Sequence, residues 1–277
     1  MIAIVGGGRM GRSLASVLSE AGERVVLWSR REASGAVTDA IAGAQTVLLA
    51  VPDDVLDPLA RELASGEVVG ADQVVLHLSG VHDRRILAPL GETGASLGSL
   101  HPLQTISEPG QAGARWRGAY AAIEGDTLAL EEAERLCGLL GLVPVRLPEG
   151  AKVAYHAGAV VASNYVVVLA EVAARIAEAG GVPREAADRM YLPLLRGAAE
   201  NLQRQLPADA LTGPIRRGDA ATVRRHLSVL GEPERTLYAQ LGLRALALAR
   251  GGGLSQAAAE EIERLLRNRA GVTGPQS

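Results

Sequence analysis

The chain opens with an apolar run that leads directly into a glycine cluster, Ile2-Ala3-Ile4-Val5-Gly6-Gly7-Gly8-Arg9-Met10-Gly11. Gly6, Gly8 and Gly11 fit the spacing G-x-G-x-x-G between a strand and an amphipathic segment that runs from Arg12 to Ala21. In that context each glycine has a separate role. The first permits a tight turn after the strand, the second lets the backbone approach a pyrophosphate, and the third lets the helix pack closely on the sheet. The helix N-terminus offers free N–H groups to phosphate. The pattern predicts a dinucleotide loop, with Arg9 and Met10 beside the cofactor; the alternative is a glycine-rich turn without a ligand.

The first half of the chain alternates short apolar runs with helical segments, such as 58–64 and 130–140. This alternation is typical of an α/β fold with a doubly wound parallel sheet. The predicted strands are Ile2–Val5, Arg24–Trp28, Thr46–Val51, Val74–Ser79, Ser96–Leu100, Ala119–Ile123 and Val143–Leu147.

From Glu149 onward the strand signal disappears and long helical patterns follow. They cover 152–178, 184–205, 220–230, 233–250 and 255–268, with breaks at the run 180–183, at Pro207 and at the glycines 251–253. We therefore expect a Rossmann dinucleotide-binding domain over 1–148, an all-helical domain over 149–269 for substrate and dimerisation, and a disordered tail over 270–277.

Composition excludes several classes of protein. The 277 residues are 48% hydrophobic and carry a net charge of −3, so nothing favours nucleic acid or an anionic membrane as a partner. A lone cysteine, Cys137, and the absence of a signal-peptide pattern favour the cytoplasm. The longest apolar stretch, Ala157–Ala170, is too short and too broken for a membrane span and predicts a buried helix. No metal site is predicted.

The end of the second predicted strand indicates which dinucleotide binds. An acidic residue there would hold the ribose 2′-hydroxyl of NAD, but the chain has Ser29-Arg30-Arg31. Guanidinium groups pair well with phosphate, so we expect NADP(H), the alternative being a solvated arginine pair. Two further strand ends would approach the ribose and nicotinamide, with Ala50, Val51 and Pro52 on one and Ser79 on the other.

Lys152 is the one lysine of a chain that has 27 arginines among its 28 basic residues. A lysine in a partly buried place can release a proton near neutral pH, whereas an arginine cannot. Helical spacing puts Lys152 on one face with His156 and Ser163, and Asn164 lies at the margin of that face. A polar stripe in an apolar helix needs partners. We expect a catalytic crevice to supply them; the alternative is hydrogen bonding between domains.

Other polar residues complete the predicted site. His101 follows a strand at the same sheet edge, where it would bond a substrate carbonyl or cap a turn. His77 is expected in the core and His82 in an exposed loop. Thr212 lies in a shaped loop, and either Arg216 or Arg217, preferably Arg217, would bind a substrate carboxylate; the alternative is a solvated pair.

These stretches together resemble a family of Rossmann-like oxidoreductases with a helical DUF2520 domain. The resemblance is carried by the glycine loop, 101–103, 152–165, 211–219 and 226–227. It implies a plan similar to ketopantoate reductase, pyrroline-carboxylate reductase and the 6-phosphogluconate dehydrogenase-like group. In several of these a lysine on the first inter-domain helix acts as acid or base, a role that Lys152 matches by position. His156 stands where relatives often have Asn, one turn later.

The function hypothesis is an NADPH-dependent oxidoreductase that reduces a small carbonyl or imine, with a carboxylate-bearing 2-oxo acid (ketopantoate-like) as the candidate substrate. Lys152 would donate the proton, and His156, Ser163 and Asn164 would orient the substrate. The rival hypothesis is an NADP(H)-binding sensor or assembly protein that lacks the chemistry. The apolar helical half and the resemblance also predict a homodimer.

Overall fold

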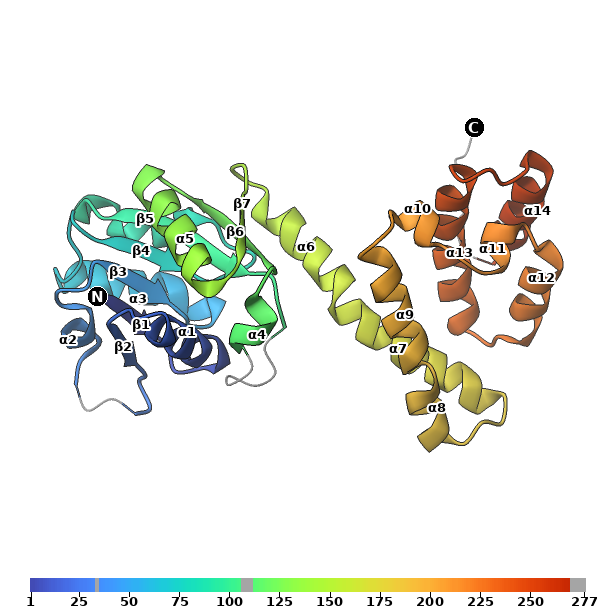
Figure 1. Ribbon diagram of the computed structural model, residues 1–277, viewed down its shortest axis with the longest axis horizontal. Helices are drawn as coiled ribbons and strands as arrows, with labels where there is room; N and C mark the ends of the chain where they lie inside the picture. Colours follow the sequence, from blue (N-terminus) through green and yellow to red (C-terminus); the bar gives the residue numbers. More distant parts are fainter. Residues whose placement is uncertain (33–34, 106–111, 270–277) are drawn as a thin grey trace. The chain divides into compact units, whose positions relative to one another are not determined.

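The chain forms a seven-stranded sheet followed by a series of helices, as the sequence predicted (Figure 1). The computed structural model describes residues 1–32, 35–105 and 112–269, so the predicted disordered tail at 270–277 lies outside it. The strands are β1 (Ile2–Val5), β2 (Val25–Trp28), β3 (Thr46–Leu49), β4 (Val74–His77), β5 (Ser96–Pro102), β6 (Tyr120–Gly125) and β7 (Val143–Arg146).

The strand order is β2-β1-β3-β4-β5-β6-β7, which places the topological switch point between β1 and β3. The first five strands run parallel, but β6 is antiparallel to β5 and β7 follows β6. The expectation of a wholly parallel sheet was therefore wrong for its last two strands. β6 begins at the edge of the sheet where β5 ends, because Pro102 and Ala121 lie opposite each other in the register.

Helices cover both faces of the sheet, and β1 and β3 are accordingly buried on both sides. On one face α1 (Arg9–Glu20) and α5 (Thr127–Leu140) pack on Ile2, Ile4 and Leu76. On the other face α2 (Val37–Ile41), α3 (Asp53–Ser65) and the 3₁₀ segment η1 (Arg84–Thr93) pack on Ala3 and Val75. The short helix α4 (Ala112–Trp116) precedes β6.

The remaining helices follow β7. They are α6 (Lys152–Ala162), α7 (Asn164–Ala179), α8 (Arg184–Met190), α9 (Leu192–Leu202), α10 (Pro207–Ala210), α11 (Pro214–Arg217), α12 (Ala220–Val229), α13 (Glu234–Arg250) and α14 (Gln256–Arg267). The chain divides into two compact units, Met1–Asn164 and Tyr165–Ser277, so α6 belongs with the sheet. In the second unit α11 to α14 enclose an apolar core that includes Val223, Leu246 and Ile262.

Two of the long predicted helices are interrupted. The pattern over 152–178 is broken at Ser163, whose φ of −121° and ψ of −68° separate α6 from α7. The pattern over 184–205 is broken at Tyr191, between α8 and α9. The breaks at the glycines 180–181, at Pro207 and at Gly251 are confirmed, since helices end or begin beside each of them.

The apolar stretch Ala157–Ala170 is not a buried helix, contrary to expectation. Val161, Val167 and Val168 are 58%, 71% and 52% exposed. Among the described residues, Lys152–Ala179 is the one helical stretch long and apolar enough to cross a membrane by length and composition, which for a single helix is weak evidence.

We predict opposite effects on stability for two glycine substitutions, one in β5 beneath α5 and one within α5. A Cβ on Gly98 would lie 2.6 Å from the Glu124 carbonyl oxygen, whereas one on Gly138 would meet no atom within 4 Å. Gly98→Ala should therefore lower the free energy of unfolding by about 1–3 kcal/mol through overpacking. Gly138→Ala, the matched control, should raise it by about 0.5–1 kcal/mol because helical glycine is unfavourable. Urea unfolding measures the free energy of unfolding of both variants. Equal changes in the two variants would contradict the close packing around Gly98.

Candidate functional site

A cavity of about 470 Å³ lies at the carboxyl ends of β1, β2 and β3, within the first unit. This volume falls in the range of small-molecule and cofactor sites. Eight of the residues predicted to bind the cofactor line it: Gly6, Gly8, Ser29, Arg30, Arg31, Ala50, Val51 and Pro52. The cavity therefore lies where open α/β sheets bind ligands, at the switch point between β1 and β3.

The glycine loop is shaped by close backbone contacts. A Cβ on Gly6, whose φ is +125°, would lie 2.2 Å from the Ala50 carbonyl oxygen. A Cβ on Gly11 would lie 1.9 Å from the Gly6 carbonyl oxygen, so α1 approaches the loop closely. Gly8 precedes the first turn of α1 and has open space where a side chain would stand. This combination leaves backbone N–H groups at a helix N-terminus free of side-chain cover, the arrangement that suits a phosphate.

Two arginines and a serine follow β2 at the cavity wall. Ser29 packs against Gly7, and Arg30 and Arg31 are exposed. An acid does line the cavity, Glu32, but the Arg12 guanidinium pairs with it and also donates to the Gly7 carbonyl oxygen at 2.9 Å. The Glu32 carboxylate at the cavity wall is therefore paired with a guanidinium group.

A short turn after β4 holds Lys152 in place. The Ser79 hydroxyl accepts hydrogen bonds from the Val81 and His82 N–H groups at 3.2 and 3.1 Å. The turn so formed aims the Ser79 carbonyl oxygen at α6, where Lys152 Nζ donates to it at 2.7 Å. The Lys152 side chain is only 2% exposed. A buried ammonium with a fixed acceptor at a strand end is the feature expected of a positioned proton donor.

The surroundings of Lys152 lower its pKa below the ordinary value for a lysine. The pKa of Lys152 is lowered to about 8. Burial is the main cause, and the negative charges of Glu124, Asp53 and Asp83 partly oppose it. A group with such a pKa is mostly protonated at pH 7 and gives up its proton readily. Lys152 is therefore in a buried environment, in which a lysine can release a proton near neutral pH.

Three aromatic side chains gather around Gly80, next to Ser79. His101 Nδ1 lies 2.9 Å from the Tyr155 hydroxyl, and the rings of His101 and His156 have centroids 6.1 Å apart. A Cβ on Gly80 would come within 2.5 Å of His156 and 2.9 Å of His101 Nε2, so glycine is required beneath the two rings. Burial, and next the Lys152 charge, lower the pKa of His101 to about 4, which keeps this imidazole neutral at pH 7.

The two other histidines of this region differ from each other. His77 is fully buried, as expected for a core histidine, and accepts from the Ser79 N–H through Nδ1 at 3.2 Å. Burial lowers the pKa of His77 to about 3. His82 is half-buried and not exposed as expected, because its N–H is held by the Ser79 hydroxyl.

The predicted site residues do not all come together. Lys152, His156 and His101 surround the Ser79–Gly80 turn, whereas Ser163 lies about 16 Å further along the helix axis at 1.5 Å per residue. Asn164 is exposed at the start of α7. In the second unit Thr212 and Arg217 are both exposed. Arg9, Met10, Gly11 and Ser79 stand outside the residues that line the cavity.

Sequence reasoning missed the roles of Tyr155 and Arg12. Tyr155 is three residues from Lys152 on α6, so helical spacing alone could have placed it on the same face. Arg12 could not be found in this way, since its pairing with Glu32 depends on how the loop after β2 folds back. Within the described residues no three His, Cys, Asp or Glu side chains are arranged to hold a metal ion.

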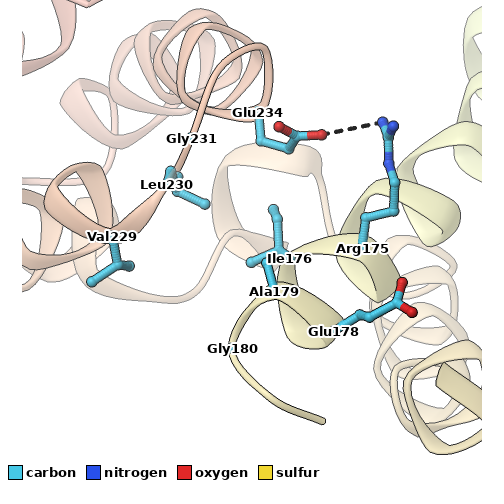
Figure 2. Close-up of a pocket in the computed structure, with 9 residues that line it drawn as sticks. All are labelled: Arg175, Ile176, Glu178, Ala179, Gly180, Val229, Leu230, Gly231 and Glu234. Carbon is cyan, nitrogen blue, oxygen red and sulfur yellow. Dashed lines mark ion pairs between the residues drawn. The ribbon is translucent and has the colours of Figure 1, made fainter. Parts of the chain in front are cut away.

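A second cavity, of about 530 Å³, lies within the helical unit between the end of α7 and the α12–α13 connection (Figure 2). Its charged groups already have partners, because Arg175 pairs with Glu234 at 3.2 Å and with Glu171. The other lining residues are mostly apolar or glycine. We therefore assign the candidate site to the sheet edge.

A mostly parallel sheet with a glycine loop at its switch point defines a Rossmann-like domain, here followed by a helical unit. Family comparison agrees with this. Residues 1–102 match the Rossmann-like domain, and residues 119–245 match the domain of unknown function DUF2520. The chain belongs to the proteins that join a Rossmann-like domain to a DUF2520 domain, which confirms the resemblance seen in the sequence. A search of curated proteins found no match.

Several solved structures share the fold over nearly the whole chain. Protein TM1727 from Thermotoga maritima is 22% identical, with a TM-score of 0.70 over 91% of this chain and 99% of that one. An imine reductase from Myxococcus stipitatus in complex with NADP⁺ is 17% identical, with a TM-score of 0.61 and coverage of 97% and 93%. Plasmodium falciparum pyrroline carboxylate reductase with NADP bound is 13% identical, with a TM-score of 0.59 and coverage of 95% and 98%.

Proposed function

We propose that the protein is an NADPH-dependent reductase of a small carbonyl or imine compound that carries a carboxylate. The observation that carries this proposal is the sole lysine, buried and bonded to Ser79 at the sheet edge where the dinucleotide cavity lies. Structures with the same fold include an imine reductase and a pyrroline carboxylate reductase with NADP bound. A 2-oxo acid is the alternative substrate to an imine.

The residues of the cavity fit an NADP(H) molecule. Gly8 leaves space for a pyrophosphate at the N-terminus of α1, and Arg30 and Arg31 offer two guanidinium groups for a 2′-phosphate. The pairing of Glu32 with Arg12 removes the acid that would repel that phosphate. When bound, a reduced nicotinamide supplies hydride.

Lys152 supplies the proton in this proposal. Its ammonium group, oriented by the Ser79 carbonyl oxygen, donates to the oxygen or nitrogen on which negative charge develops, and the lysine is left neutral. His101 and His156 frame the space above Gly80 and offer uncharged hydrogen-bonding groups to the substrate. We keep Ser163, Asn164, Thr212 and Arg217 as predicted substrate contacts.

A cytoplasmic homodimer is the assembly that we propose. The exposed Val167 and Val168 of α7, with Tyr165 at 54% exposure, form an apolar surface that a second copy of this chain would cover.

Replacing Lys152 should separate binding from turnover. Lys152→Met should lower the rate of NADPH oxidation about 10²–10⁴-fold, the usual contribution of a positioned proton donor, and leave NADPH binding unchanged. The wild-type rate should fall as pH rises through about 8, because Lys152 then loses its proton. Absorbance at the nicotinamide band over a panel of 2-oxo acids and cyclic imines measures turnover, and cofactor fluorescence measures binding. Val153→Ala, an exposed neighbour, is the control.

Full turnover in Lys152→Met would remove Lys152 from the mechanism. NADPH binding without oxidation across the whole panel would instead favour the sensor or assembly protein.

Arg30 and Arg31 should set the preference for NADPH over NADH. The double variant Arg30→Ala/Arg31→Ala should raise the Kd for NADPH at least tenfold, since each charge-assisted hydrogen bond contributes about 1.5–3 kcal/mol before solvent screening. The Kd for NADH should stay the same. Arg61→Ala on α3 is the control, because that guanidinium pairs with Asp57 and does not line the cavity. An equal rise in the Kd for both cofactors would mean that the arginines attract phosphate in general and do not select the 2′-phosphate.

Disrupting the apolar surface should dissociate the homodimer. Val167→Glu adds a charge to a side chain that is 71% exposed, so the single chain should remain folded. Light scattering coupled to size exclusion should give twice the chain mass for wild type and one chain mass for the variant. Val229→Glu is the matched control. Val229 is the last residue of α12 and is 80% exposed, so this variant should stay dimeric. A wild-type monomer would refute the proposed assembly.

A further inference from the structure

The His101 imidazole and the Tyr155 hydroxyl form a hydrogen-bonded pair between the end of β5 and α6. Nδ1 of His101 lies 2.9 Å from the Tyr155 hydroxyl, and the two rings meet edge to face with centroids 5.7 Å apart and an interplanar angle of 88°. Both residues belong to the compact unit Met1–Asn164, as does the Lys152 contact with Ser79. The pair is therefore part of the sheet-edge site, although the proposed reduction gives no role to Tyr155.

A hydroxyl can donate or accept in such a pair, and its other contacts decide which it does. An unprotonated imidazole nitrogen accepts well, whereas a phenol oxygen shares its lone pairs with its ring and accepts weakly. In the reverse direction the Tyr155 proton would itself need an acceptor, and the described part of the chain holds no other hydrogen-bond partner for this hydroxyl. The hydroxyl therefore donates to Nδ1 of His101, and the ring proton is carried by Nε2.

Both groups keep their neutral forms at pH 7. Burial is the largest cause that lowers the pKa of His101 to about 4, followed by the charges of Lys152 and His156. Asp53 acts in the opposite direction. Burial raises the pKa of Tyr155 to about 12, so its hydroxyl keeps its proton. A neutral His101 has one N–H to offer, and the partner of Nδ1 decides which nitrogen carries it.

Nε2 is the atom of His101 that lies beside the Ser79–Gly80 turn. A Cβ built on Gly80 would stand 2.9 Å from it. Nε2 has no hydrogen-bond partner among the described residues, and His101 is only half-buried, so this N–H stays accessible. Lys152 Nζ donates to the Ser79 carbonyl oxygen at 2.7 Å. An imidazole N–H and an ammonium group thus serve the same two-residue turn.

We propose that Tyr155 is a positioning residue that holds His101 in the tautomer with its proton on Nε2, so that His101 offers a fixed, uncharged N–H to an oxygen acceptor of the substrate. The inference rests on the proposed function in one respect, that the substrate lies above Gly80. A donor at this place favours a carbonyl or carboxylate oxygen. Because the ring is uncharged, it adds this donor without placing a second buried cation near Lys152.

Nitrogen NMR of the histidine side chains tests the tautomer without cofactor or substrate. In protein labelled with ¹⁵N in histidine, long-range correlations between ring protons and nitrogens distinguish a protonated nitrogen from an unprotonated one, and His101→Gln assigns the His101 signals. At pH 7 Nδ1 of His101 should be unprotonated and Nε2 protonated. His77 is the internal reference for this tautomer, since its Nδ1 accepts from the Ser79 N–H at 3.2 Å. A protonated Nδ1 on His101 overturns the proposal.

Tyr155→Phe removes the hydroxyl and keeps the ring that packs on His101. Nδ1 should then lose its donor, its signal should move, and a fraction of the rings should carry the proton on Nδ1. Tyr238→Phe is the matched control, since Tyr238 and His226 in the helical unit form a pair with the same 2.9 Å contact and 5.7 Å ring separation. That variant should move the signals of His226 alone. An unchanged tautomer and Nδ1 signal of His101 in folded Tyr155→Phe overturns the proposal.

Turnover gives a second readout, on the substrate that the panel of 2-oxo acids and imines identifies. Tyr155→Phe should lower kcat/KM about three- to tenfold, the usual contribution of one neutral hydrogen bond, and leave the Kd for NADPH unchanged. An unchanged kcat/KM in a variant whose His101 tautomer has changed overturns the role of His101 as a donor. Failure here is distinct from failure of the proposed function, since the NMR measurement needs neither NADPH nor a substrate and turnover by Lys152 variants is scored separately.

Discussion

The hydrogen bond from Lys152 Nζ to the Ser79 carbonyl oxygen ties the first helix after the sheet to the end of β4. An ammonium group that is 2% exposed costs several kcal/mol to desolvate, so its neighbours must compensate for that cost. The Ser79 turn supplies the acceptor. The neutral state of His77 and His101 belongs to the same arrangement, because a second buried cation beside Lys152 would raise the cost further.

The cavity and the lysine depend on the same sheet edge. Parallel strands bring Gly6, Ser29, Ala50 and Ser79 to their carboxyl ends, whatever the side chains in between. A second unit is not needed to form the dinucleotide cavity or the Lys152 contacts, since all of these residues lie in Met1–Asn164.

The sequence could predict those parts of the site that depend on local patterns of residues. The glycine spacing, the strand ends and the isolation of Lys152 are each visible within about ten residues, and each leads to a residue that the structure places at the sheet edge. Glu124 could not be predicted, because β6 looks like any apolar strand until its antiparallel register sets it opposite Ser99. Register is decided by packing across the whole sheet and leaves no local signal.

The apolar stretch over 157–170 shows a related limit of sequence patterns. Hydrophobic side chains reveal that a surface will be covered, but they do not reveal whether the cover comes from the same chain. Val167 and Val168 are adjacent and both exposed, so no single amphipathic face accounts for them. Composition therefore predicts that residues 157–170 are largely helical, but it does not predict which of their side chains are buried.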